Sequence, residues 1–281
     1  MRRLLAFDLD GTLLDDDKHI PEENLRAIAA AAERGWVPVP ATGRLFSGIP
    51  QAVKELPGVR WYIVSNGAGV YDALEDCTLL REEITPQQAV RLYEYMDSLP
   101  VIYDCYQGEG GFMTRSMYEN CEEFFPFEPH MYRMVKLLRK PVDELKRFLL
   151  EKGEPLQKMQ VFFRPRDLEL RRRVLEEFPR RFPELSGTTS VSNNIEINSA
   201  RAGKGKAILA LAKHLGIPYE GTVAFGDGTN DREMLQMAAL GVAMANADPA
   251  VKAVADEITA TNNEGGVGKV ILRLLEEDDA E

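Results

Sequence analysis

Two stretches of this 281-residue chain alternate short apolar runs with amphipathic helical segments, and this alternation constrains the fold more than any other feature. Near the amino terminus the apolar runs cover residues 4–7, 36–41 and 61–65, and a small hairpin is expected over 70–80. The helical segment between the first two runs begins at Pro21, ends at Gly35 and is expected to bury Leu25, Ile28, Ala29 and Ala32. This pattern is typical of β–α–β units, which build a parallel sheet buried on both faces.

Residues 204–281 repeat the alternation. Helices are expected over 204–215 and from Asn230, strands over 222–225 and 241–244, and a final helix before an acidic tail. We therefore predict an α/β core with a doubly wound, Rossmann-like parallel sheet. One feature is unusual for a strand: Pro38 and Pro40 lie in the run 36–41, although proline cannot donate a hydrogen bond to a neighbouring strand.

The middle of the chain has a different pattern. Thr85-Pro86-Gln87-Gln88 has the form of a helix capping box with proline at the first helical position. Strands are expected over 101–106, 111–114 and 158–163, and helices over 141–152 and 168–178. Residues 83–188 are therefore predicted to form an α+β domain inserted into a core made of residues 1–82 and 189–281.

Composition and charge exclude several classes of function. The formal net charge of -11 argues against nucleic acid or an anionic membrane as the main partner, because phosphate-rich surfaces bind cationic patches. The three cysteines include no C-x-x-C pair, and no apolar run reaches the ~18 residues that a membrane span needs. We expect a cytoplasmic protein whose partner is a small molecule; the sequence does not indicate its oligomeric state.

A pair of carboxylates follows the first apolar run. Asp8 and Asp10 lie two residues apart, and Gly11 then permits a sharp turn. Residues i and i+2 of a strand share a face, so both carboxylates are expected at the carboxyl edge of the sheet, where open α/β folds bind ligands. Carboxylates this close repel each other unless a cation or a proton lies between them. Taken alone, the pair also fits a polar turn with solvated acidic side chains.

A second acidic cluster follows the expected strand 222–225. Gly226-Asp227-Gly228-Thr229-Asn230-Asp231 again places carboxylates at the end of a strand. Asp231 also fits the first turn of a helix, where a carboxylate interacts favourably with the helix dipole. Asp227, however, would lie at the same sheet edge as Asp8. Carboxylates from two separate strand ends make an oxygen-rich site that suits Mg²⁺.

Two further segments carry groups that bind phosphate. Ala41-Thr42-Gly43-Arg44 follows the second apolar run and supplies a hydroxyl, a backbone amide and a guanidinium. Gly203-Lys204-Gly205 begins an expected helix, where a lysine and free amides can hold an oxyanion. Taken alone, Lys204 also fits an exposed basic residue in a loop.

These segments, in this order, resemble the motifs of the haloacid dehalogenase superfamily, and specifically its Cof-type phosphatases with a large inserted cap similar to type IIB. The family motifs D-x-D-G-T-L, A-T-G-R, K-G and G-D-x-x-N-D-x-x-M match Asp8–Leu13, Ala41–Arg44, Lys204-Gly205 and Gly226–Met234. Ser65–Ala68 and Gly241–Ala247 are similar to the S-N-G-A and G-V-A-M-x-N-A segments of this branch. The resemblance covers the core and is weak in the expected cap.

The resemblance implies Mg²⁺-dependent hydrolysis of a small phosphorylated metabolite, such as a sugar phosphate or a phosphorylated cofactor, through an aspartyl phosphate. Asp8 would be the nucleophile, and Asp10 would protonate the leaving group and then activate water. Mg²⁺ would be held by Asp8, the backbone carbonyl of Asp10 and Asp227, with Asp231 as an outer or additional ligand. Thr42, Gly43, Lys204 and Asn230 would bind the phosphoryl group, and Arg44 and Asn66 would orient the substrate.

Two other functions stay open at this point. A phosphomutase of the same branch, resembling phosphomannomutase, would return the phosphoryl group to bound sugar faster than water attacks it. A sensor would bind a phosphorylated ligand without turnover, although the presence of both Asp8 and Asp10 argues against it. The resemblance also implies that the cap sets selectivity, but the arginines at 171–173 and 180–181 are interpreted as a solvated helix face paired with neighbouring glutamates.

Overall fold

The computed structural model describes residues 1–127 and 129–280, which form two compact units. One unit contains Met1–Arg81 and the chain from Gly203 onward, and the other contains Glu82–Ala202. The return to the first unit therefore lies at Gly203 rather than at residue 189. The reason is that strand β11 (Asn194–Ser199) pairs with β10 (Leu185–Thr188) and β9 (Lys158–Phe163) in the sheet of the second unit.

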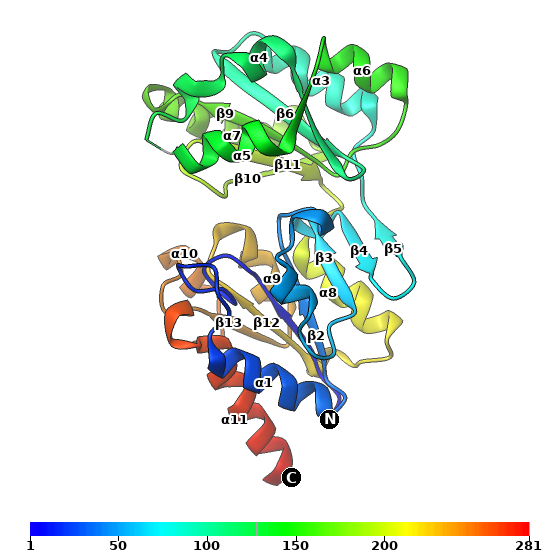
Figure 1. Cartoon of the computed structure of the whole chain (residues 1–281), viewed down its shortest axis with the longest axis vertical. Coiled ribbons are helices and arrows are strands. Elements are labelled where there is room, and N and C mark those ends of the chain that lie inside the picture. Colours follow the sequence, from blue (N-terminus) through cyan, green and yellow to red (C-terminus); the bar gives the residue numbers. More distant parts are fainter. Residues whose placement is uncertain (128, 281) are drawn as a thin grey trace. The chain divides into compact units, whose positions relative to one another are not determined.

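The first unit is built on a five-stranded parallel sheet in the order β14-β13-β12-β1-β2, part of which is labelled in Figure 1. Its strands are β1 (Leu4–Phe7), β2 (Val37–Pro40), β12 (Thr222–Gly226), β13 (Leu240–Ala243) and β14 (Glu257–Ile258). β1 lies between β12 and β2, and all four of its residues are buried. Burial on both faces explains its continuous apolar sequence and confirms the predicted α/β core with a parallel sheet.

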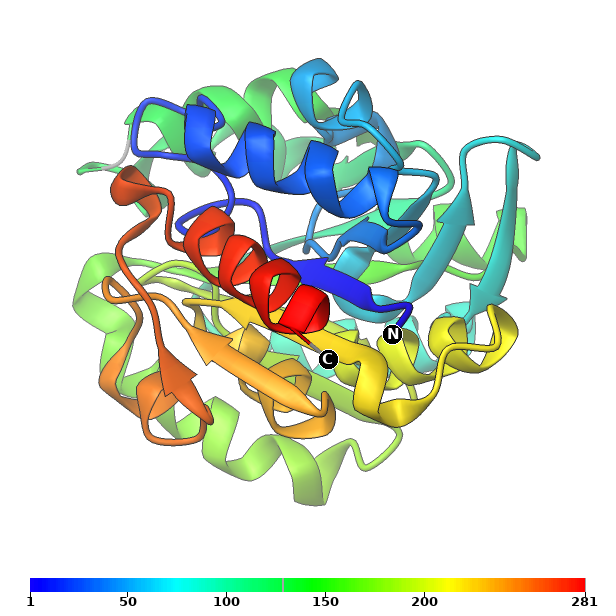
Figure 2. The same ribbon diagram turned by 90° about the horizontal axis from the view of Figure 1, so that it is seen from below.

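The helices of this unit are α1 (Glu22–Glu33), α2 (Gln51–Lys54), α8 (Lys204–His214), α9 (Arg232–Met237), α10 (Pro249–Lys252) and α11 (Gly266–Ala280). α1 and α11 lie side by side, as the blue and red helices of Figure 2 show. The predicted buried face of α1 is confirmed at Ile28 but is wrong at Leu25, which is exposed, while Asn24 is buried. The Asn24 amide donates to the Leu13 carbonyl and accepts the Gly268 N–H, so this polar side chain links α1 to two other segments.

The prolines of β2 do not disrupt its pairing with β1. Val37 and Ala41 donate their N–H groups to the carbonyls of Arg3 and Phe7. Pro38 and Pro40 occupy the alternate positions, where the backbone nitrogen faces away from β1 and no hydrogen bond to that strand is lost. On its other side, the end of β2 contacts β3, because the Thr42 N–H donates to the Ile63 carbonyl. β3 (Trp61–Val64), β4 (Gly69–Asp72) and β5 (Cys77–Arg81) form a separate antiparallel sheet.

The second unit has a six-stranded sheet in the order β10-β11-β9-β6-β7-β8, with β6 (Val101–Gln107), β7 (Gly110–Thr114) and β8 (Arg139–Val142). Its helices are α3 (Pro86–Met96), α4 (Arg115–Glu119), α5 (Pro129–Leu138), α6 (Leu145–Lys152) and α7 (Leu168–Arg181). The predicted capping box is confirmed at Thr85 before α3. The helix predicted over 141–152 begins only at Leu145, because the preceding residues form β8 and pair with β7. The predicted insertion is thus an α+β unit.

The sheet of the second unit has chemically different faces. Tyr103, Val161 and Ile195 belong to an apolar cluster with residues of α3, α6 and α7. Residues at alternate positions carry charge, including the ion pairs Arg139–Asp104 at 2.7 Å and Lys158–Glu196 at 3.0 Å. On α7, the exposed Arg172 pairs with Glu169 and Glu176, which agrees with the interpretation of a solvated face at this arginine. No helix in the described part of the chain is long and apolar enough to cross a membrane.

Candidate active site

Loops that follow neighbouring strands bring the predicted site residues together in the first unit. Asp8 and Asp10 follow β1, Thr42 follows β2, and Asp227 follows β12. These three strands are adjacent and parallel, so all four residues lie at the carboxyl edge of the sheet. Lys204, the first residue of α8, reaches the same edge through its side chain.

Lys204 is the buried cation of this cluster. Its Nζ donates to Asp8 Oδ1 and to Asp231 Oδ1, both at 2.6 Å, and its side chain is 0% exposed. Burial alone would lower the pKa of Lys204, but the carboxylates of Asp231 and Asp8 outweigh it and the pKa is raised. This geometry excludes the alternative of an exposed loop lysine and places a fixed positive charge beside Asp8.

A close approach of two loops places Lys204 at the site. Gly67 has φ +87, and a side chain there would overlap the backbone of Gly203 and Lys204. Gly67 closes the short 3-10 turn Ser65–Gly67 that follows β3. Gly67 therefore lets the loop after β3 pack against the start of α8.

Asp231 links Lys204 to the loop after β12. Its Oδ2 accepts the N–H groups of Asp227 at 3.1 Å and Gly228 at 3.0 Å, while its Oδ1 accepts the Lys204 hydrogen bond. Both oxygens are thus engaged by the protein itself. This arrangement suits the outer role that the sequence left open for Asp231.

Asp227 is held by the loop after β1. Its Oδ1 accepts a hydrogen bond from Thr12 Oγ1 at 2.7 Å. Gly11 has φ +86, and a side chain at this position would overlap the Asp227 carboxylate. Glycine at position 11 therefore permits both the sharp turn and the close approach of the Asp227 side chain. Thr12 was not assigned a role from the sequence, although it lies inside the D-x-D-G-T-L motif.

The three carboxylates of Asp8, Asp227 and Asp231 form a group that fits a divalent cation. Each offers an oxygen, and these oxygens lie within 4.8 Å of one another. Burial raises the pKa of Asp8 to about 8 despite the Lys204 charge. Burial, followed by the Asp231 charge, raises the pKa of Asp227 to about 6. A bound cation would stabilise the ionised form of these buried carboxylates, and oxygen donors suit Mg²⁺.

We predict that Mg²⁺ affinity falls as the pH is lowered. A metal binds the ionised carboxylate, and protons compete for Asp227 below about pH 6 and for Asp8 below about pH 8. The dissociation constant should increase by about tenfold or more for each pH unit below pH 6. Isothermal titration calorimetry from pH 5 to pH 9 measures this, and an affinity that does not change with pH would contradict it.

The predicted phosphate-binding residues meet beside this cluster. Thr42 is buried, and its carbonyl accepts the Asn66 N–H at 3.0 Å. Asn66 has φ 57, and its Oδ1 accepts a hydrogen bond from Asn230 Nδ2 at 3.3 Å. Gly43 lies in the same loop, directly after Thr42. The residues that the resemblance assigned to phosphate and substrate binding are therefore close neighbours of the acidic cluster.

Arg44 makes a contact that the sequence did not predict. Its Nε donates to Asp10 Oδ2 at 2.9 Å and its Nη2 donates to Asp10 Oδ1 at 2.8 Å. Lys18 Nζ lies 3.0 Å from Asp10 Oδ1. Burial would raise the pKa of Asp10, but these two cations outweigh it and lower the pKa. The sequence held no signal for Lys18, which lies in a polar loop.

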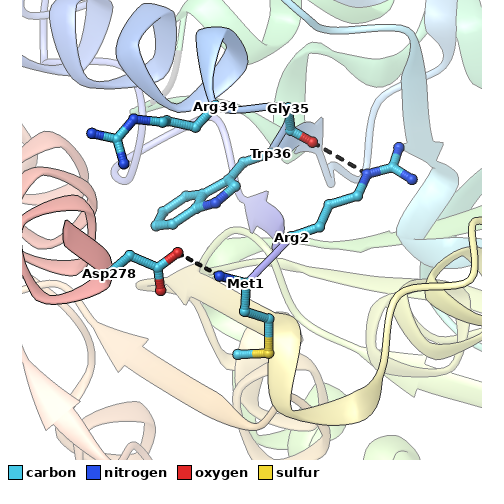
Figure 3. Close-up of a pocket in the computed structure, with 6 residues that line it drawn as sticks. All are labelled: Met1, Arg2, Arg34, Gly35, Trp36 and Asp278. Atoms are coloured by element: carbon cyan, nitrogen blue, oxygen red, sulfur yellow. Dashed lines mark hydrogen bonds and ion pairs between the residues drawn. The ribbon is translucent and has the colours of Figure 1, made fainter. Parts of the chain in front are cut away.

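A surface pocket of about 470 Å³ lies elsewhere in the first unit (Figure 3). It is lined by Met1, Arg2, Arg34, Gly35, Trp36 and Asp278. Met1 and Arg2 precede β1, and Trp36 precedes β2, so the pocket lies at the amino edge of the sheet. It is therefore separate from the carboxylates at the carboxyl edge.

The parallel sheet, the inserted unit and the acidic cluster around a buried lysine define a haloacid dehalogenase-like hydrolase. The sequence profile of that family matches residues 5–271, and the chain belongs to it. The similar proteins include phosphatase YwpJ of Bacillus subtilis, 30% identical over 97% of this chain and 100% of the relative. 5-amino-6-(5-phospho-D-ribitylamino)uracil phosphatase YcsE of the same organism is 30% identical over 96% of this chain and 94% of the relative.

A solved structure confirms the fold class. The sugar phosphatase BT4131 of haloacid dehalogenase subclass IIB superposes with a TM-score of 0.78 over 97% of this chain and 98% of the other. The two sequences are 24% identical. The α/β fold with a parallel central sheet and separate cap sheets is therefore the fold of subclass IIB.

Proposed function

We propose that this protein hydrolyses small phosphomonoesters through an aspartyl phosphate formed on Asp8. The observation that carries the proposal is the contact of Lys204 with Asp8 and Asp231 beside Asp227. Lys204 holds Asp8 Oδ1, whereas Asp8 Oδ2 has no hydrogen-bond partner among residues 1–127 and 129–280. Oδ2 is thus the oxygen available to attack phosphorus.

The remaining groups supply charge and proton transfer. Lys204, Thr42 and the Gly43 amide would hold the phosphoryl oxygens, with Asn230 and Asn66 ordering the loops around them. Mg²⁺, held by Asp8, Asp227 and the backbone carbonyl of Asp10, would offset negative charge on the carboxylates and the phosphoryl group. Asp10 would give a proton to the leaving oxygen and take one from the attacking water.

The energetic demand explains why so many groups are needed. Hydrolysis of a phosphate monoester can require an acceleration of ~10²¹, or about 28 kcal/mol. One preorganised donor contributes about 3–4 kcal/mol. A nucleophile, a buried cation, a metal site and an acid–base group must therefore act together, and the residues proposed for these roles lie at one edge of the sheet.

The names of two relatives support a proposed substrate class. YcsE is named for a phosphoribityl-bearing uracil, and the subclass IIB structure is a sugar phosphatase. We propose a phosphate ester of a sugar, a sugar alcohol or a cofactor precursor as the substrate of this chain. A cytoplasmic location stays a prediction that fits a small phosphorylated metabolite as partner.

Phosphate release from a panel of phosphomonoesters, with Mg²⁺ and with EDTA, tests the proposal. Release that requires Mg²⁺ is expected from at least one ester of the panel. A phosphomutase would instead convert a hexose phosphate to its isomer without free phosphate, and a sensor would bind the ester without any conversion. Either result, with the protein folded, would contradict the proposed hydrolysis.

A further inference from the structure

Three asparagine side chains hold the loop that follows β1. They come from different segments: Asn24 from α1, Asn246 from the loop after β13, and Asn262 from a 3-10 turn before α11. Each donates its side-chain amide to a backbone carbonyl of the loop, Asn24 to Leu13, Asn246 to Gly11 and Asn262 to Leu14. The contact of Asn246, at 2.8 Å, is the one made directly between Asp10 and Thr12.

Asn246 joins two loops that lie on either side of a third. The strands that precede these loops lie in the order β13-β12-β1, and the middle strand, β12, leads to Asp227. Asn246 follows β13 and bonds to Gly11 after β1, so its side chain links the two loops that flank the Asp227 loop. The same segment also holds Asp227 directly, because the Asp248 N–H donates to the Asp227 carbonyl at 3.1 Å. The loop after β13 therefore contacts both loops that carry the proposed Mg²⁺ ligands.

The Asn246 amide is held by a donor on one side and an acceptor on the other. Its Oδ1 accepts the Asn262 N–H at 3.0 Å, while its Nδ2 donates to the Gly11 carbonyl. A backbone N–H can only donate and a carbonyl can only accept, so a rotated amide would lose both hydrogen bonds. Asn246 is exposed, and these hydrogen bonds rather than burial therefore fix its side chain.

Gly11 and Thr12 connect this contact to Asp227. The Gly11 carbonyl and the Thr12 nitrogen belong to one planar peptide, so fixing that carbonyl restricts where Thr12 lies. Thr12 is buried, and its Oγ1 donates to Asp227 Oδ1 at 2.7 Å. Gly11 itself lies so close to Asp227 that a Cβ at this position would be 2.4 Å from Oδ2. A shift of the Gly11 peptide would therefore displace the Asp227 carboxylate.

We propose that Asn246 is a positioning residue for the proposed Mg²⁺ site. By holding the Gly11 carbonyl, it keeps Thr12 in place. Thr12 in turn fixes the Asp227 carboxylate relative to Asp8. Mg²⁺ binds with a strict octahedral geometry, so a small displacement of one carboxylate lowers the affinity for the ion. This inference rests on the proposed function, which assigns Mg²⁺ to these carboxylates.

Calorimetric titration of the metal-free full chain with MgCl₂ at pH 8, without substrate, measures this role apart from catalysis. Groups that orient metal ligands typically contribute about 10- to 100-fold to metal affinity. Because Asn246 is exposed and water can replace part of its contact, Asn246→Ala should raise the dissociation constant by about tenfold, at the lower end of that range. The Mg²⁺ concentration that gives half-maximal phosphate release should rise by the same factor. At saturating Mg²⁺, kcat should return to within about twofold of the wild-type value.

Another exposed asparagine that contacts the same loop provides the matched control. Asn263 Nδ2 donates to Asp16 Oδ2 at 2.9 Å, and its Oδ1 accepts the Asp16 N–H at 3.0 Å. Asn263→Ala therefore also removes one donated and one accepted hydrogen bond, but four residues beyond Thr12. It should change the Mg²⁺ dissociation constant by less than about twofold. Without metal, Asn263→Ala and Asn246→Ala should unfold at the same urea concentration, because each loses the same kind of exposed contact.

A double-mutant comparison tests whether Asn246 acts through Thr12. Thr12→Val removes the hydroxyl that holds Asp227 but keeps the branched shape of the side chain. In this background the Gly11 peptide no longer controls the Asp227 carboxylate through that hydrogen bond. Asn246→Ala should then raise the Mg²⁺ dissociation constant by less than about threefold, instead of the full effect seen in the wild-type background.

Three results would overturn the inference and leave the proposed function intact. The first is an Mg²⁺ dissociation constant of Asn246→Ala equal to that of Asn263→Ala. The second is an undiminished effect of Asn246→Ala in the Thr12→Val background, and the third is a fall in kcat that saturating Mg²⁺ does not restore. A wild-type chain that binds no Mg²⁺ and releases no phosphate from any ester would instead overturn the proposed function and, with it, the role of Asn246.

Discussion

Asp8→Asn is expected to reduce phosphate release by at least about 10⁴-fold, the largest effect on activity of any single substitution in this chain. The amide cannot attack phosphorus, and no other described carboxylate has its position next to Lys204 Nζ with one oxygen open. The measurement is the rate of phosphate release with Mg²⁺ on the best ester of the panel. The matched control is Asp279→Asn, which should retain wild-type activity. Asp279 lies on α11, and its exposed carboxylate pairs with Arg34.

The residual rate decides the role of Asp8. A variant that keeps more than about one per cent of the wild-type rate would show that water attacks phosphorus directly, without a nucleophile on the protein. Far-ultraviolet circular dichroism of the variant should match the wild-type spectrum, because asparagine has nearly the same volume and can still accept the Lys204 hydrogen bond through its Oδ1.

Lys204→Met is expected to have the largest effect on stability. The lysine has no exposed surface and forms ion pairs with Asp8 and Asp231, so methionine leaves two buried carboxylates without their cation. Breaking a buried ion pair on one side destabilises by about 3–5 kcal/mol. Urea unfolding at pH 8 without metal measures the free energy. Both tryptophans, Trp36 and Trp61, lie in the first unit, so their fluorescence reports the unfolding of that unit.

A neighbouring lysine on the same helix provides the control. Lys206 is exposed and lies 3.5 Å from Glu233, so Lys206→Met should change the free energy of unfolding by less than about 1 kcal/mol. A Lys204→Met variant that unfolds at the same urea concentration as Lys206→Met would contradict the structural role assigned to Lys204. Lys204→Met should also lose phosphate release, which a purely structural lysine elsewhere in α8 would not cause.

The core of the fold could be predicted because its strands are buried on both faces. β1 and β12 read as continuous apolar runs, and each ends in carboxylates that mark the carboxyl edge of the sheet. The return from the inserted unit could not be placed in this way. β11 alternates Asn194, Glu196 and Asn198 with apolar residues, and its polar positions lie on the charged face of the second sheet. A buried polar face gives no apolar signal, so the sequence pattern does not show that this segment belongs to the second unit.

The residues of the site likewise divide into those that the sequence predicts and those that it does not. Asp8, Asp227 and Lys204 could be predicted because each lies in a short motif at the end of a strand or the start of a helix. The contact between Arg44 and Asp10 depends on the path of the loop after β2, which a linear pattern does not encode. Lys18 reaches Asp10 from a polar loop. Thr12, in the loop after β1, contacts Asp227 in the loop after the neighbouring strand β12. Such contacts arise from tertiary packing and leave no periodic signal.

Trapping the covalent intermediate tests the proposed chemistry most directly. The Asp10→Asn variant should form the phosphoenzyme from 4-nitrophenyl phosphate and Mg²⁺ but release it slowly, because its base is absent. After an acid quench, mass spectrometry of the proteolytic peptides should find one phosphoryl group on the peptide that contains Asp8, and none in a variant that also carries Asp8→Asn. Burst release of 4-nitrophenol with no phosphorylated peptide, or a phosphoryl group on another residue, would contradict the assignment of Asp8 as the nucleophile.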